Sequence, residues 1–277
     1  MFKPTEIVID GAVPHLLAEY DRMFGDTEPE HRRVIASVAR MALDKIAGSD
    51  ALYHDLDHAL NVTFVMQEIL KGKRALDGDV SPHDWTHMVV AALCFAIGFV
   101  RGALPGDGDG RYVIGADGAT TTLPEGATDA ALMPWVSARS SLFVRARFVD
   151  HPVLDAEFLS ESIACTRLPI AACTPVAAPG WPGLLRAAQI VGTVADPDFP
   201  LKLTALFLEL KEIGQHEALG YTDVSALRAR YPGLFWNLFA PHLGRATRYL
   251  RATDDGRQWL ANMNAHLLAE EHRETGS

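Results

Sequence analysis

Cysteine is scarce in this sequence: Cys94, Cys165 and Cys173 are the only ones among 277 residues, and no two form a CxxC pair. A sparse, odd set is typical of a reducing compartment rather than of a disulfide framework. The longest apolar run, Met88–Val100, is shorter than the roughly 20 residues that cross a bilayer. The N-terminus has no basic stretch followed by an apolar core, so we find no secretion signal. These absences predict a cytoplasmic protein without a membrane span.

Positive charge is also in short supply. The chain has 25 Lys and Arg against 35 Asp and Glu, a formal net charge of −10, and the acids are spread along its length. A general nucleic-acid binder needs a dense basic face, so we expect no nucleic-acid partner. The sequence also lacks an internal repeat, a heptad run and a Gly-rich phosphate loop.

The pattern that is present is helical. Spacings of i, i+4, i+8, i+11 and i+15 place five residues on one helical face and turn them toward the core. These residues are His54, His58, Val62, Val65 and Ile69. The histidines are therefore expected to point inward.

A second segment has the start signals of a helix, with Ser81 as cap and Pro82 at the first helical position. From Met88 onward it is apolar all round, which predicts the buried central helix. Further helices are expected at 134–149, 153–167, 181–194, 200–214, 222–230, 233–251 and 254–272. We predict one all-α domain of about ten helices spanning residues 1–277.

Residues 105–132 break this pattern because Gly, Asp and Pro are dense there. The pattern allows a short hairpin from "RYVIG" to "ATTTL". A loop of this length inside a compact domain is typical of a lid, a binding loop or a disordered segment. The "DGDG" stretch lacks the spaced acids and closing Glu of a calcium loop, so it predicts turns.

The stretch "YHDLDHALNV" carries the chemistry. Two histidines at i, i+4 can bind one metal ion, or can act as an acid and a ligand, or can form a buried hydrogen-bonded pair.

This stretch resembles the YHxxxHA motif of the HD-domain metal-dependent phosphohydrolases, a superfamily that includes cyclic-nucleotide phosphodiesterases. "VVAALCFAIGFVRG" and "LLRAAQIVGTVADP" resemble the helices that normally supply the His-Asp doublet and the last aspartate. "LRARYPGLFW" and "DGRQWLANMNAH" resemble the C-terminal part of a bacterial branch. The similarity covers roughly residues 50–270 and implies the HD-like helical fold.

The resemblance also assigns residues. His58 matches the first metal-binding histidine, and His54 matches the histidine that protonates the leaving group in phosphodiesterase-like members. Phe95-Ala96 stand where the family has His-Asp, and Gln189 stands at the last aspartate. Three of the four ligands that the family uses are therefore absent from this chain.

Hydrocarbon side chains cannot hold a dication, which needs several lone-pair or anionic ligands. We therefore favour an inactive homologue, a pseudoenzyme, with no metal cofactor expected, a vestigial metal ligand in His58 and a vestigial acid in His54. Such a protein would act by binding a small molecule or a protein partner in the former cleft. The ligand-binding residues would be His54, Asp55, His58, Phe95, Phe99, Arg101 and Gln189. For Arg101, a bound anionic group and a structural ion pair with a nearby acid remain equal alternatives.

The alternative is an active metal-dependent phosphohydrolase or phosphodiesterase with a rearranged site for Mn, Fe, Zn or Mg. Its ligands would come from His54, Asp55, Asp57, His58 and His87. A third hypothesis is a structural or assembly factor, and the sequence is compatible with a homo-oligomer. Elsewhere, Arg139, Arg145 and Arg147 predict a solvated helix face.

Overall fold

The structure is a computed structural model that describes residues 3–167 and 180–275. Cys173, one of the three cysteines, lies outside the described residues. The described α-helices of the first half are α1 (Pro4–Phe24), α2 (Pro29–Ile46), α3 (Leu56–Asp77), α4 (Pro82–Cys94), α5 (Val136–Phe148) and α6 (Ala156–Ala164). Those of the second half are α7 (Trp181–Val194), α8 (Phe199–Glu212), α9 (Gln215–Ala218), α10 (Val224–Leu234), α11 (Gly244–Leu250) and α12 (Asp254–Thr275). The all-α prediction is confirmed.

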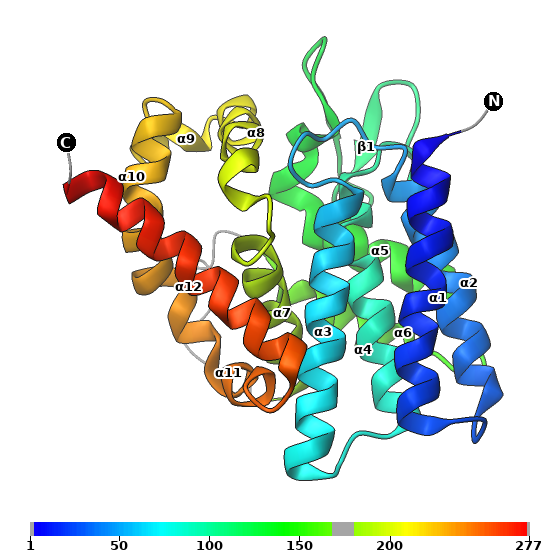
Figure 1. Ribbon diagram of the computed structural model, residues 1–277. Helices are drawn as coiled ribbons and strands as arrows, with labels where there is room; N and C mark the ends of the chain where they lie inside the picture. The colour runs from blue at the N-terminus through cyan, green and yellow to red at the C-terminus, as the bar shows by residue number, and fades with distance from the viewer. Residues whose placement is uncertain (1–2, 168–179, 276–277) are drawn as a thin grey trace.

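The two ends of the chain form opposite sides of the molecule (Figure 1). The helices α1 and α2 lie on one side, α10 to α12 lie on the other, and α3 and α7 run between them. One continuous cluster of buried hydrophobic side chains extends from Ile9 in α1 to Leu267 in α12. Among the described helices, none is long and apolar enough to cross a membrane.

The central helix α4 begins as the sequence predicts. The Ser81 hydroxyl accepts a hydrogen bond from the Asp84 backbone N–H at 3.1 Å, and the Asp84 carboxylate accepts one from the Ser81 N–H at 3.0 Å. This reciprocal arrangement satisfies two N–H groups at the helix start, and Pro82 fits the first helical position. Every side chain from Met88 to Cys94 is fully buried, which confirms the prediction of a buried helix.

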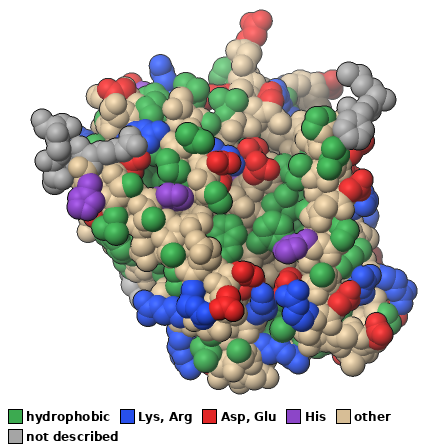
Figure 2. Space-filling model, in the orientation of Figure 1, with side chains coloured by type: hydrophobic (Ala, Val, Ile, Leu, Met, Phe, Trp, Pro, Cys, Tyr) green, Lys and Arg blue, Asp and Glu red, His purple; other side chains and the backbone are tan. Residues whose placement is uncertain are grey.

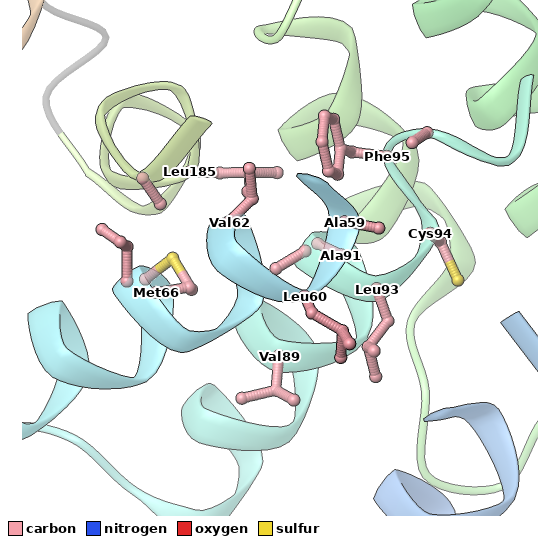
Figure 3. Close-up of a cluster of buried hydrophobic side chains, with 14 of the residues drawn as sticks. Ala59, Leu60, Val62, Met66, Val89, Ala91, Leu93, Cys94, Phe95 and Leu185 are labelled. Carbon is pink, nitrogen blue, oxygen red and sulfur yellow. The ribbon is translucent and has the colours of Figure 1, made fainter. Parts of the chain in front are cut away.

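Helix α3 packs against α4 on one side and α7 on the other. Figure 3 shows Leu60 and Met66 of α3, Leu93 of α4 and Leu185 of α7 in one buried cluster. The two backbones of α3 and α7 come close at Gly192, where an added Cβ would lie 2.8 Å from the Val62 Cα. Only glycine allows this approach without moving a backbone.

The long helix expected at 233–251 is broken. A π-helix, η4 (Phe235–Phe239), and a 3-10 helix, η5 (Ala240–His242), come before α11. Pro241 cannot donate a backbone hydrogen bond, and Gly244 adopts a φ of +41°. The helix expected at 200–214 ends earlier for a similar reason, because Gly214 has a φ of +71° between α8 and α9.

The hairpin in the 105–132 segment is confirmed. Strands β1 (Arg111–Val113) and β2 (Thr120–Thr122) pair antiparallel, with Tyr112 opposite Thr121. The segment lies at one end of the helices (Figure 1) and leads through 3-10 helix η2 (Asp129–Trp135) into α5. Another 3-10 helix, η1 (Ile97–Phe99), links α4 to this region.

Arg139 holds the base of the hairpin segment, and the prediction that it belongs to a solvated face is wrong. Its side chain is 0% exposed and pairs with the equally buried Asp107 at 2.9 Å. It also donates to the carbonyl groups of Gly98 at 2.7 Å, Val100 at 3.0 Å and Val113 at 2.5 Å. Burial alone would raise the pKa of Asp107, but the hydrogen bonds from Arg139 and from backbone N–H groups outweigh it and hold that pKa below its usual value.

Candidate functional site

His54 and His58 lie together where α3 begins. His58 is in the first turn and points inward as predicted, with 2% of its surface exposed. His54 is not on the helix, because α3 begins at Leu56. Its ring centroid still lies 5.0 Å from that of His58, and the two rings are nearly perpendicular. The structure therefore brings the two histidines together through the turn before the helix.

Glu209 of α8 fixes this turn, and it was not among the residues predicted for the site. Its carboxylate accepts a hydrogen bond from the His54 Nδ1 at 2.5 Å, and further bonds from the backbone N–H groups of Tyr53 at 2.7 Å and His54 at 3.2 Å. The residue is 1% exposed. Burial would raise the pKa of Glu209, but the His54 charge, the ring hydrogen bond and the two backbone N–H groups lower it below the usual value. Since Nδ1 is directed at the carboxylate, Nε2 is the His54 nitrogen left for a bound molecule.

One signal for Glu209 is present in the sequence. The apolar stripe of α8 runs through Phe199, Leu203, Phe207 and Leu210, all of them buried. Glu209 stands directly beside Leu210, at the edge of this stripe. A carboxylate at such a position needs a partner, because an isolated buried charge is costly. The sequence does not say that this partner is His54, 155 residues away.

His58 has no hydrogen-bond partner on either ring nitrogen among the described residues. Its ring lies between those of Tyr53 and Phe95, with centroids 5.3 Å and 5.7 Å away. Burial, the neighbouring His54 and Lys202 lower the pKa of His58 well below its usual value. The imidazole is therefore neutral at pH 7.

This depressed pKa makes stability depend on pH. The unfolded chain binds a proton at His58 below about pH 6.5, whereas the folded chain does not, so acid favours unfolding. We expect the free energy of unfolding to fall with pH below about 6.5, with His58 contributing up to about 1.4 kcal/mol per pH unit. Replacing His58 with Phe should remove this contribution, as measured by urea unfolding between pH 7 and 5. His15→Phe, at an exposed histidine, is the control. An unchanged slope in His58→Phe would contradict the assignment.

Four of the predicted ligand-binding residues surround one small cavity of about 20 Å³ beside η1. The lining residues are His54, Phe95, Phe99, Met133, Val136, Thr166 and Gln189. The Phe99 ring stacks on the His54 ring with centroids 4.5 Å apart. A space of this size holds about one water molecule. The rings of Phe95 and Phe99 therefore line a space too small for an organic ligand.

A larger cavity of about 120 Å³ adjoins it and shares His54, Met133 and Gln189. Side chains from α7, α8 and α10 form most of its wall. The other lining residues are Tyr53, Ile190, Thr193, Val194, Leu206, Leu210, Gln215, Leu219, Tyr221, Leu227, Tyr231, Leu234, Leu238 and Phe239. None of the described lining residues of either cavity is Lys, Arg, Asp or Glu. The cavity is thus a largely apolar chamber, and the His54 and Gln189 side chains lie at the end that it shares with the small cavity.

Asp55, His58 and Arg101, although predicted as ligand-binding residues, are not among the described lining residues of these cavities. Asp55 is the N-cap of α3, and its carboxylate accepts a hydrogen bond from the His58 backbone N–H at 2.9 Å. Arg101 forms ion pairs with Asp129 and with Asp50, the latter at 2.5 Å. Of the two alternatives for Arg101, the structure shows the structural ion pair.

Asp57 and His87, two of the five residues of the rearranged metal site, do not join His54 and His58. Asp57 has a side chain that is 60% exposed and lies 3.7 Å from Lys202. The His87 Nε2 accepts a hydrogen bond from the Asp155 N–H at 2.8 Å, and its Nδ1 lies 2.8 Å from the His83 carbonyl oxygen. In the part of the chain that the structure describes, no three His, Cys, Asp or Glu side chains are grouped to hold a metal ion. Of the rings beside His58, only that of His54 carries a lone-pair nitrogen, and Phe95 supplies none. Two imidazoles do not make up the ligand set that a dication needs.

A family comparison covers nearly the whole chain. The chain belongs to the Npun_R2479-like family, whose model matches residues 2–273. The search of curated proteins and the search of solved structures found no match.

Proposed function

We propose that this protein binds a small, largely apolar molecule in the cavity beside His54, and that it does not act as a metallohydrolase. The observation that carries the proposal is the apolar chamber of about 120 Å³ with the His54–Glu209 pair at one end. The resemblance to HD phosphohydrolases adds support, since Phe95, Ala96 and Gln189 stand at the positions of their metal ligands. A concave cavity of this size fits a small molecule better than a protein partner.

The lining chemistry specifies a neutral ligand. A phosphate or carboxylate in this chamber would meet no Lys or Arg among the described lining residues, and an unpaired buried charge is costly. A hydroxyl group can exchange hydrogen bonds with the His54 Nε2 and the Gln189 amide. A cavity of about 150 Å³ holds one benzene ring, so this chamber is suited to a single ring or a short chain. The ligand class is therefore an apolar molecule with one hydroxyl group, such as a phenol.

Phenol is expected to raise the thermal unfolding temperature by about 3 °C at saturating concentration, whereas benzoate should not. Leu206→Trp should abolish the effect because the indole fills the chamber that Leu206 lines. The matched control is Leu208→Trp on the same helix, where the side chain is exposed and absent from the lining. Differential scanning fluorimetry measures all three proteins.

Two results would contradict the proposal. One is an equal phenol response in Leu206→Trp and Leu208→Trp, which would place binding elsewhere. The other concerns metal chemistry. Protein purified without chelator that carries stoichiometric Mn, Fe or Zn and turns over a phosphodiester would show an active enzyme.

A further inference from the structure

A second cavity, of about 490 Å³, lies on the far end of α7 from the His54 chamber. It is formed by the start of α7, by α11 with the residues before it, and by the C-terminal part of α3. The described lining residues are Lys73, Asp79, Gly180, Trp181, Gly183, Leu184, Arg186, Pro241, His242, Leu243, Gly244, Arg245 and Tyr249. Figure 2 shows Lys and Arg side chains, interspersed with Asp and Glu, along the lower part of the face in view, where α11 and the start of α12 lie.

Arg186 is the unusual group in this wall. It is only 8% exposed, and within the described residues no carboxylate pairs with its guanidinium. Its Nε donates to the Cys165 carbonyl at the end of α6, at 2.5 Å. The partial negative charge at a helix C-terminus, roughly half an elementary charge, offsets the guanidinium only in part. A buried cation with such incomplete compensation is costly unless an anion completes it.

His242 adds a second donor beside Arg186. The two side chains meet at 3.2 Å between the Arg186 Nη1 and the His242 Nδ1. Arginine can only donate, so the His242 Nδ1 accepts and its proton is carried on Nε2. Burial and the Arg186 charge lower the pKa of His242, which agrees with this neutral form. The pair therefore offers N–H groups and no free acceptor.

The remaining charges leave the cavity positive. Lys73 is neutralised by Asp79 at 2.5 Å and by Asp77 at 3.6 Å. Arg245 is exposed on α11, and no ion pair joins it to a carboxylate within the described residues. Among the residues that the structure describes, the guanidinium groups of Arg186 and Arg245 are thus left without a carboxylate.

We propose that this cavity binds a small organic oxyanion, whose carboxylate or phosphate group takes the donors of Arg186, His242 and Arg245. A guanidinium matches both groups with two parallel hydrogen bonds. The organic body lies against Trp181 and Leu184, because the volume exceeds that of an inorganic ion and falls in the range of small-molecule sites. This site is separate from the His54 chamber and takes a ligand of opposite character.

Isothermal titration calorimetry with the full chain tests the proposal, using phenyl phosphate, benzoate, inorganic phosphate and benzyl alcohol as probes. Phenyl phosphate or benzoate should bind, and benzyl alcohol should not. Arg186→Met should weaken binding by about tenfold or more, and Arg245→Gln by severalfold. The matched control is Arg248→Gln, which removes the same charge one turn along α11 and is not part of the wall. Leu206→Trp should leave anion binding intact, so the two sites fail or succeed separately.

Three outcomes would overturn it. Arg186→Met that folds and binds as tightly as the unmodified chain would remove the central residue from the site. Arg248→Gln that loses as much affinity as Arg245→Gln would show general surface attraction. Benzyl alcohol that binds as well as benzoate would show an apolar site. Because Arg245 is exposed, Arg245→Gln should fold, and its affinity for the oxyanion can be measured even if Arg186→Met fails to fold.

Discussion

Replacing Glu209 with Ala is expected to lower the free energy of unfolding by about 3–5 kcal/mol. The substitution removes the acceptor of three hydrogen bonds at a fully buried position, and it leaves the His54 ring and two backbone N–H groups without partners. Buried groups that lose their partner cost the full penalty of desolvation. Urea unfolding followed by circular dichroism measures the change.

Two further variants show whether the loss of stability comes from the buried Glu209 carboxylate. Glu209→Gln keeps the size and one acceptor, so it should lose less stability than Glu209→Ala. Glu217→Gln changes a side chain that is 84% exposed and should stay within about 0.5 kcal/mol. A loss below about 1 kcal/mol in Glu209→Ala would mean that the His54 turn does not depend on this carboxylate.

Replacing Arg139 with Met should be about as damaging, at roughly 3–5 kcal/mol. The Asp107 carboxylate would stay buried without its cation, and three backbone carbonyl groups would lose a donor. The matched control is Arg145→Met on the same helix, whose exposed ion pair with Glu157 is worth at most about 1 kcal/mol. Chemical denaturation of both variants compares them directly. Equal losses would show that burial of Arg139 has no energetic consequence.

The burial of Arg139 and the exposure of Arg145 could not be predicted from the sequence. Arg139 and Arg145 occur on one short helix with the same charge. The helical period turns them about 120° apart, but it does not show which distant residues either one meets. What separates them is the 105–132 segment, which returns and supplies Asp107 and the carbonyl group of Val113. Local pattern shows which face of a helix is apolar, but it does not show which distant carboxylate will come to rest there.

In the candidate site, too, local features were predicted correctly and contacts between distant residues were not. The apolar pattern correctly predicted the inward direction of His58 and the burial of α4, because both depend only on local periodicity. Alignment to a motif placed His54, Phe95, Phe99 and Gln189 together, and these four do line one cavity. It also included His58, which is buried and lines neither cavity, and Asp55 and Arg101, which the structure uses as a helix cap and in ion pairs. The pairing of Glu209 with His54 could not be predicted, because His54 lies in the turn before α3, 155 residues away in the sequence.

The close contact between Gly192 and Val62 has a mechanical consequence. Helix α7 is a common wall: its first two turns line the oxyanion cavity, and its later residues line the chamber beside His54. If α7 could slide or tilt, a ligand bound in one cavity would change the shape of the other. Because the backbones of α3 and α7 are in contact at Gly192, α7 has little room to slide, and we expect a ligand in one cavity to leave the affinity of the other unchanged.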